Sequence, residues 1–432
     1  RWEYIFLIAG STVTDYLVAQ AIHKSSDQRK RKLLLYFSLS LNLGLLFTFK
    51  YFDFFSGSVN AMFELANMAY MIPMLDVVLP VGISFYTFQT LSYTIDVYKG
   101  DIEPEKHFGI FALFVSFWPQ LVAGPIERSS RLLPQFHKHH DFDYDRAVWA
   151  LNRIAYGFFK KVVVADRLSI YVNEVYGDLD NYPTLPILLA SFFFAFQIYC
   201  DFSGYTDIAI GCAALMGFTL MENFDRPYLS RSISEFWRRW HISLSSWFRD
   251  YVYIPMGGSR VVKWRWYYNL FITFLVSGLW HGAAWTFVVW GALHGIYLVI
   301  GVVSAPIRLR LFKAWRLDRW PKTVHVYQVL TTFFLVVVGW IFFRAGSMHN
   351  AAIVFGKILK PDLSMNPSIL MAYQGPYNFL VSLMAVGMLA MSYIILPKNM
   401  KLKRNLLFLV ATIIIILLFG KGGASEFIYF QF

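Results

Sequence analysis

The chain has 432 residues, of which 57% are hydrophobic, 19% aromatic and 15% charged, and its formal net charge is +12. A soluble domain carries about a quarter charged residues, so this composition excludes an ordinary soluble enzyme. Apolar runs of roughly 20 residues, long enough to cross a bilayer, recur along the chain. They predict a polytopic helical membrane protein.

Taken in chain order, the apolar runs define the candidate membrane segments. These are 2–22, 33–55, 77–98, 107–123, 148–176, 184–217, 268–280, 284–304, 324–343, 377–396 and 405–420. Several are too short, too long or interrupted. We therefore expect an all-α bundle of about ten to eleven transmembrane or re-entrant helices, with interfacial amphipathic helices, forming a single membrane domain over residues 1–432. Arg1 already enters an apolar run, so we expect one more helix before it.

Basic residues indicate the orientation of the chain in the membrane. They gather in 24–32, 308–322 and 398–404. The positive-inside rule places such loops in the cytoplasm, so the excess charge reports topology and anionic lipid rather than nucleic acid. The arginine-rich segment 222–266 belongs on the same side, and 107–123 fits the charges better as a re-entrant segment than as a crossing.

The two cysteines, Cys200 and Cys212, fall in one apolar segment. Twelve residues apart on a helix, they would lie about 18 Å from each other, too far for a disulfide. We expect both to be buried small hydrophobes. Neither CxxC nor HExxH spacing occurs in the sequence, so we expect no metal site and no bound cofactor.

Residues 232–249 predict one amphipathic helix lying at the membrane surface. Ser232 and Glu235 have the spacing of a capping box. His241 falls at the border between the polar face and the apolar stripe, so it could face the protein interior, or it could be an interfacial histidine without chemistry. The stripe follows helical spacing and comprises Ile233, Phe236, Trp237, Trp240, Leu244, Trp247 and Phe248.

His281 lies in a stretch, 277–294, that is otherwise apolar, small or aromatic apart from its last residue, His294. An imidazole titrates near neutral pH, and a titratable group at membrane depth is a functional candidate. The alternative is a histidine that only satisfies a backbone carbonyl. The preceding 13-residue helix, 268–280, would span about 20 Å, less than a bilayer core of about 30 Å, which would leave His281 at depth.

Several stretches together resemble the membrane-bound O-acyltransferase family, and within it the branch that acetylates bacterial alginate. They are Phe236–Arg260, Gly278–Gly282, Pro80–Tyr98, Ala123–Arg128, Tyr199–Asp207 and the terminal Phe427–Phe432. The seven residues Ile254–Arg260, which follow an arginine-aspartate turn, favour this branch over the D-alanyl transferases of teichoic acid.

The resemblance implies transfer of an acyl group, most simply acetyl from acetyl-coenzyme A or another thioester. The donor would be cytoplasmic, and the acceptor a hydroxyl of an exported polysaccharide or a periplasmic SGNH-type relay partner, at the bacterial inner membrane. It implies that His281 is the family's invariant histidine and His241 its second functional histidine, within a catalytic core segment, 222–294. A neutral buried imidazole can take the proton of an alcohol.

Other residues are candidates for supporting roles. Asp201 or Asp207, in an apolar segment broken at 203–204, could orient His281 as a carboxylate orients a catalytic base. The alternative is a helix cap or a structural hydrogen bond. Trp280 and Gly282 flank His281, and we find no unambiguous donor for an oxyanion. We take His294 to be structural, and expect the remaining histidines at the surface: His23, His107, His137, His139, His140, His325 and His349.

Arginines and glycines supply the expected substrate routes. Arg128, Arg238 and Arg239 are candidates to bind the phosphates of a coenzyme A donor, although each could equally fix topology. Gly278, Gly282 and Gly124 would permit a narrow channel in which the two substrates meet from opposite faces.

Two competing functions remain open at this stage. The first keeps the fold and changes the reaction to D-alanyl or peptidoglycan O-acyl transfer. The second is a transporter of acyl groups or lipid-linked sugars, for which only membrane character and buried polar residues speak. The sequence shows no internal repeat, which disfavours an inverted-repeat transporter.

Overall fold

The computed structural model describes residues 2–80, 82–121, 124–362, 364, 366–372, 374–395, 406–422 and 427–428. This part of the chain is helical and contains no β-strand, which confirms the all-α fold. Six of its helices are long and apolar enough to cross a membrane: Ile5–Lys24, Gln28–Leu65, Thr184–Leu215, Trp285–Val303, Pro321–Arg344 and Gly375–Ile394. The expected total of about ten to eleven transmembrane or re-entrant helices stays a prediction. The basic segment 398–404 and most of the terminal motif lie outside the described residues.

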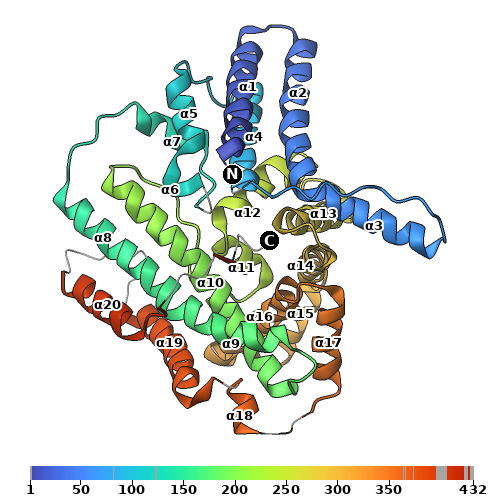
Figure 1. Cartoon of the computed structure of the whole chain (residues 1–432), viewed down its shortest axis with the longest axis vertical. Coiled ribbons are helices and arrows are strands. Elements are labelled where there is room, and N and C mark those ends of the chain that lie inside the picture. Colours follow the sequence, from blue (N-terminus) through green and yellow to red (C-terminus); the bar gives the residue numbers. More distant parts are fainter. Residues whose placement is uncertain are drawn as a thin grey trace. The chain divides into compact units, whose positions relative to one another are not determined.

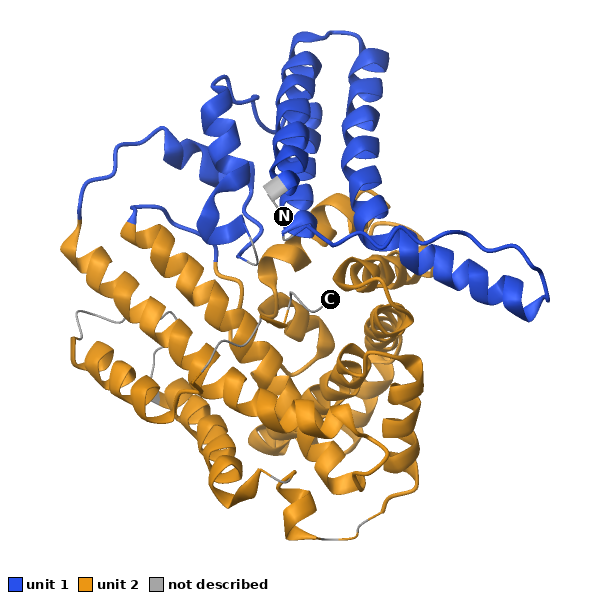
Figure 2. Cartoon of the chain, viewed as in Figure 1, with its two compact units in different colours: residues 1–142, 216–221 blue, residues 143–215, 222–432 orange. Residues whose placement is uncertain are grey.

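The chain forms two compact units (Figure 2). Unit 1 comprises residues 1–142 and 216–221, and unit 2 comprises residues 143–215 and 222–432. That both belong to one membrane domain stays a prediction.

Unit 1 is built around three packed helices, α1, α2 and α4 (Figure 1). The buried carboxylate of Asp15 on α1 joins α1 to α2, because it accepts hydrogen bonds from Ser38 at 2.5 Å and Asn42 at 3.0 Å. Its helices are α1 (Ile5–Lys24), α2 (Gln28–Leu46), α3 (Phe52–Leu65), α4 (Ile83–Lys99), α5 (Phe108–Ser116), α6 (Trp118–Leu121) and α7 (Ser129–Phe136), with a π-helical turn, Phe47–Tyr51, between α2 and α3.

The segment expected to be re-entrant is divided between two short helices. α5 has nine residues, about 14 Å of helix, and α6 has four. Neither can cross a bilayer core of about 30 Å. The short helices fit a segment that does not cross as one helix, and its re-entrant course stays a prediction.

In unit 2, α8 and α9 pack along α10, and α13, α14 and α16 form a second group (Figure 1). Its helices are α8 (Tyr144–Phe158), α9 (Asp166–Gly177), α10 (Thr184–Leu215), α11 (Ile233–Arg239), α12 (Ile242–Phe248), α13 (Lys263–His281), α14 (Trp285–Val303), α15 (Ala305–Ala314), α16 (Pro321–Arg344), α17 (Met348–Leu359), α18 (Pro367–Leu370), α19 (Gly375–Ile395) and α20 (Leu406–Phe419). Two π-helical turns, Phe159–Ala165 and Arg249–Tyr253, follow α8 and α12.

The break expected at residues 203–204 is wrong, because α10 runs without interruption through 32 residues. Gly204 serves close packing against α8 instead. A Cβ at Gly204 would lie 2.8 Å from the carbonyl oxygen of Gly157, and a Cβ at Gly157 would lie 2.6 Å from that of Gly204. Small residues let two backbones approach in this way. Both cysteines lie on α10 and are free, as expected, although Cys212 is only half-buried.

The expected 13-residue helix before His281 is also wrong. α13 begins at Lys263 and has 19 residues, about 28 Å. The basic and aromatic residues 263–267 are not apolar enough to read as a membrane segment, yet they are helical. The length of α13 therefore gives no reason to place His281 part-way through the bilayer.

The predicted helix 232–249 is two helices, since the chain breaks between α11 and α12 at His241. There His241 has left-handed backbone angles, with φ of 43°. Residues 223–225 stabilise the break: Ile242 N–H donates to the carbonyl oxygen of Asn223, and Asp225 N–H donates to that of Arg239, both at 2.9 Å. All seven residues of the predicted apolar stripe are buried.

The predicted helix start at residue 232 is confirmed. The side chain of Ser232 accepts a hydrogen bond from Glu235 N–H at 3.1 Å. The reciprocal bond differs from a capping box, because the Glu235 carboxylate accepts from the backbone N–H of Arg231 at 2.8 Å.

Candidate functional site

The site lies in unit 2, where α13 and α14 form a tightly packed helical hairpin. A Cβ at Gly278 would overlap the carbonyl oxygen of Phe287 and lie 2.9 Å from the Cα of Gly291, and a Cβ at Gly282 would overlap the Phe287 ring. Atoms of the neighbouring helix therefore occupy the space where side chains at these two positions would lie. The expectation that Gly278 and Gly282 open a channel is wrong, because their lack of side chains is used for helix packing.

His281, the last residue of α13, is 5% exposed. Its Nδ1 lies 2.7 Å from the carbonyl oxygen of Ser277. A carbonyl oxygen only accepts hydrogen bonds, so Nδ1 carries the proton and, in the neutral ring, Nε2 carries the lone pair. The ring lies among aromatic side chains, with centroid distances of 4.8 Å to Trp290 and 5.6 Å to Phe343.

His241 is fully buried, so its ring faces the protein interior, which is the first of the two alternatives that the sequence left open. Its Nδ1 lies 3.1 Å from Oδ1 of Asn223, an atom that also accepts from the backbone N–H and the hydroxyl of Ser243. A backbone N–H only donates, which identifies that Asn223 atom as the oxygen. Nδ1 of His241 is therefore protonated, as in His281. Burial, and secondarily the nearby His281, lowers the pKa of His241 well below its usual range.

Trp280 is a neighbour of both histidines. Its ring centroid is 6.2 Å from that of His241 and 5.1 Å from that of His281. The structure thus brings together three of the residues singled out in the sequence. Both imidazoles are held through Nδ1, which leaves the Nε2 edge of each ring as its basic edge.

Asp201 and Asp207 are engaged by cations. Asp201 accepts from Lys161 at 2.6 Å and from the backbone N–H of Ile428 at 2.7 Å. Asp207 pairs with Arg153 at 2.6 Å and with Lys160. Ser277 holds His281, so the structure assigns the two aspartates to ion pairs rather than to orienting the histidine.

Two successive lysines in the π-helical turn after α8 both reach α10. Lys160 and Lys161 lie inside the turn Phe159–Ala165 and are both buried. Two adjacent lysines inside the apolar segment 148–176 were the sequence signal for these ion pairs, and sequence reasoning missed it.

The three arginine candidates have different environments. Arg239 pairs with Glu235 at 2.6 Å. Arg128 belongs to unit 1, so its expected role is untested. Arg238 lines a cavity of unit 2 together with Arg249, which belongs to the arginine-rich segment 222–266 and pairs with Asp250 at 2.8 Å.

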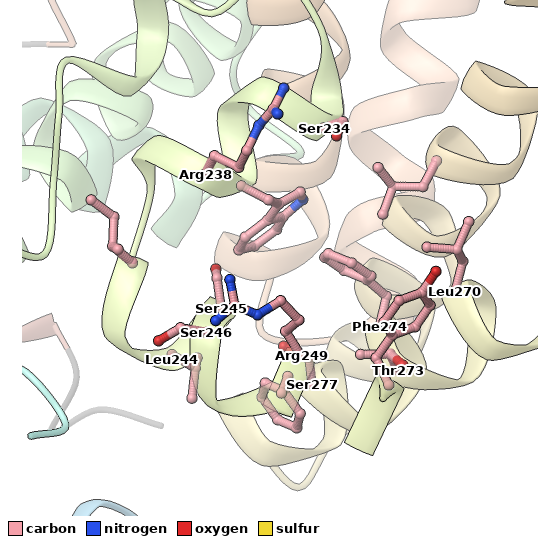
Figure 3. A pocket seen from close by; sticks show the side chains of 15 residues that line it. Ser234, Arg238, Leu244, Ser245, Ser246, Arg249, Leu270, Thr273, Phe274 and Ser277 are labelled. Atoms are coloured by element: carbon pink, nitrogen blue, oxygen red, sulfur yellow. The ribbon is translucent and has the colours of Figure 1, made fainter. Parts of the chain in front are cut away.

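This cavity has a volume of about 310 Å³. Figure 3 shows Arg238 and Arg249 across from Leu270, Thr273 and Phe274 of α13. The remaining lining residues are Ser234, Trp237, Ile242, Leu244, Ser245, Ser246, Phe248, Tyr253, Ser277 and Leu298. Ser277, whose carbonyl holds His281, and Trp237 connect this mostly apolar cavity to the histidine cluster.

His294 also belongs to the cluster. It lies 13 residues after His281, but the hairpin of α13 and α14 brings both histidines to Trp290, at centroid distances of 4.8 and 4.9 Å. The indole N–H of Trp237 donates to Nδ1 of His294 at 3.2 Å. The seven histidines expected at the surface are exposed, except for His140, which is half-buried.

The fold and the site define a multi-pass helical membrane protein with a buried histidine cluster. Residues 106–345 match the MBOAT, membrane-bound O-acyltransferase family. The chain belongs to this family and is a membrane O-acyltransferase.

The chain is similar to bacterial acyltransferases with three different names. The chain is 41% identical over 359 residues to the probable alginate O-acetylase AlgI of Pseudomonas putida, covering 82% of this chain and 71% of the relative. It is 35% identical over 391 residues to the peptidoglycan O-acetyltransferase of Helicobacter pylori, covering 84% and 71%. It is 27% identical over 290 residues to the teichoic acid D-alanyltransferase of Bacillus subtilis, covering 62% and 69%. The names of these relatives refer to alginate, peptidoglycan and teichoic acid.

Proposed function

We propose that the chain transfers acetyl groups from a cytoplasmic thioester, such as acetyl-coenzyme A, to hydroxyls of an exported, alginate-like polysaccharide. The transfer would occur at the bacterial inner membrane, directly or through a periplasmic SGNH-type relay partner. The observation that carries the proposal is the pair of buried histidines, each fixed through Nδ1 to an oxygen acceptor. The higher identity to alginate and peptidoglycan acetylases than to the D-alanyl transferase supports acetyl as the acyl group.

In this proposal His281 is the general base. Its Nε2 takes the proton from the acceptor hydroxyl while the hydroxyl oxygen attacks the thioester carbonyl carbon. The C–S bond then breaks, and the departing thiolate takes that proton from His281. His241, across Trp280, stays neutral because its burial disfavours a charge and presents a second basic nitrogen to the same centre.

The cavity beside α13 is the proposed donor site. Its volume of about 310 Å³ lies at the lower end of the range for small-molecule sites, about 300–1,000 Å³. Arg238 and Arg249 supply guanidinium groups for phosphates, and the apolar walls suit the thioester arm. Ser277 lines the cavity and binds His281, so a donor there would approach the base.

The test uses the whole protein in lipid nanodiscs with radiolabelled acetyl-coenzyme A and alginate oligomers. We expect His281→Ala to lose at least about 100-fold in rate, the lower end for a positioned general base, and His241→Ala to lose nearly as much. His349→Ala changes an exposed histidine on α17 and should keep wild-type activity. Wild-type rates in His281→Ala would contradict the assignment of the base.

Changing the acceptor decides between the related reactions. Transfer to peptidoglycan fragments but not to alginate would replace the proposed acceptor. Transfer of D-alanine but not acetyl would replace the proposed acyl group.

A further inference from the structure

Two buried N–H groups beside His281 have no hydrogen-bond partner within the described part of the chain. They are Nε1 of Trp290 and Nε2 of His294, and both side chains are fully buried. Buried polar groups in folded proteins are nearly always paired, and an exception asks for an explanation. Two unpaired nitrogens on adjacent rings, whose centroids lie 4.9 Å apart, therefore indicate a place for an acceptor that the chain itself does not supply.

The hydrogen bond from Trp237 fixes the proton of His294 on Nε2. An indole N–H can only donate, and it points at Nδ1 of His294 from 3.2 Å. Nδ1 therefore carries the lone pair, and the neutral ring carries its proton on Nε2. Nε2 of His294 and Nε1 of Trp290 are consequently both donors.

Both donors face the same point on α16. A Cβ built onto Gly339 would lie 2.8 Å from Nε2 of His294 and 3.5 Å from Nε1 of Trp290. Any residue larger than glycine would place its side chain against both nitrogens. Gly339 therefore lies directly beside both N–H groups, and a larger residue there would displace them.

The donor pair lies beside the proposed base, because Trp290 itself packs on His281 with a centroid distance of 4.8 Å. His281 packs on Phe343 of α16 with a centroid distance of 5.6 Å, and Phe343 follows Gly339 by four residues. Four residues of helix rise about 6 Å. An acyl-transfer site needs a reacting atom about 3 Å from both the base or nucleophile and the oxyanion donors, and the packing of Trp290 on both His281 and His294 brings the two groups to one place.

We propose that His294 and Trp290 donate the two hydrogen bonds that hold the carbonyl oxygen of the acyl donor as it becomes an oxyanion. This inference rests on the proposed function, with His281 as the base. When the acceptor oxygen bonds to the carbonyl carbon, the π-electron pair of the C=O bond moves onto the carbonyl oxygen, and both N–H groups donate to it. The C=O bond re-forms as the C–S bond breaks, and the thiolate leaves with the proton from His281.

Replacing one donor at a time tests the pair, with acetyl-coenzyme A as the probe. Trp290→Phe removes the N–H and keeps an aromatic ring. We expect kcat to fall about 100- to 1,000-fold, the loss typical of one oxyanion donor, while KM for acetyl-coenzyme A stays within threefold. His294→Leu should show the same pattern. His294→Gln retains a donor and an acceptor for Trp237, and should recover most of kcat.

A pair of glycine variants tests the same place without removing either donor. Gly339→Ala puts a methyl group against both nitrogens and should lower kcat by at least tenfold. Gly301→Ala is the matched control on α14, since a Cβ there meets nothing within 4 Å, and it should behave as wild type. If Trp290→Phe does not fold, the two glycine variants decide the question.

The outcomes separate this inference from the proposed function. His281→Ala inactive with Trp290→Phe and His294→Leu near wild-type kcat would overturn the donor pair alone. A structural water shared by both nitrogens would give lower melting temperatures with unchanged kcat, and this result would also overturn it. Activity in His281→Ala would overturn the proposed function itself.

Discussion

Asp207 neutralises two buried cations, and its replacement by asparagine should be strongly destabilising. Its carboxylate pairs with Arg153 and Lys160, whose side chains are 7% and 4% exposed. In Asp207→Asn, Arg153 keeps a bidentate pair with Glu222, at 2.9 and 2.6 Å. Among the residues that the structure describes, Lys160 then keeps one hydrogen-bonding partner, the hydroxyl of Ser203 at 3.0 Å.

The expected cost follows from that difference. Removing one partner of a buried pair leaves an uncompensated charge and costs about 3–5 kcal/mol. Glu222→Gln removes one anion from Arg153 but leaves Asp207 in place, and Glu222 is 56% exposed. Exposure of that kind limits an ion pair to roughly 0–1 kcal/mol, so Glu222→Gln is the matched control.

Equilibrium unfolding in mixed micelles measures both variants. Adding Lys160→Met to Asp207→Asn removes the orphaned cation, and we expect most of the lost stability to return, because apolar replacement of a whole buried pair is often neutral. Equal stability of Asp207→Asn and Glu222→Gln, or no recovery in the double variant, would refute the reasoning.

Four further predictions concern the histidine site and unit 1. Asn223→Ala removes the acceptor that fixes the tautomer of His241 and should cut the transfer rate at least tenfold with little change in KM for the donor; unchanged kcat would argue against a need for that tautomer. Burial lowers the pKa of His241 below its ordinary value of 6.5, so below pH 6.5 the unfolded chain binds a proton that the folded chain does not. The contribution of His241 to stability is therefore fully present above pH 6.5 and is lost as the pH falls below it. Melting temperatures of His241→Gln should lack this loss at acid pH. Burial raises the pKa of Glu127 from 4.5 to about 7, so between these values the folded chain holds a proton that the unfolded chain has lost. Stability therefore falls as the pH rises from 4.5 to about 7. Glu127→Gln should have a higher melting temperature than wild type at pH 8 and no higher one at pH 4. Gly282→Leu should lower the yield of folded protein, because the side chain would overlap Phe287, whereas Gly301→Leu, measured by the same size-exclusion profile, should not.

The sequence by itself determined the features that depend on local pattern. The composition predicted a helical membrane protein. The spacing of the residues located the helix cap at Ser232 and the buried stripe that follows it. The isolation of His281 in an apolar stretch marked it as the central residue of the candidate site. These features can be predicted from the sequence because helix capping, amphipathic spacing and the cost of a buried polar group each depend on neighbours in the chain.

Only the tertiary structure decided how the site is assembled. The burial and tautomer of His241 depend on Asn223, 18 residues away. His294 joins the histidine cluster because α13 and α14 approach each other closely. Asp201 and Asp207 pair with lysines that lie about 40 residues earlier in the chain. The apolar pattern also misled. It placed the start of α13 at residue 268 rather than at Lys263, and it predicted a break in α10 at a glycine that serves helix packing. Such contacts join residues far apart in sequence, and no local pattern encodes which of the available partners a buried polar group will take.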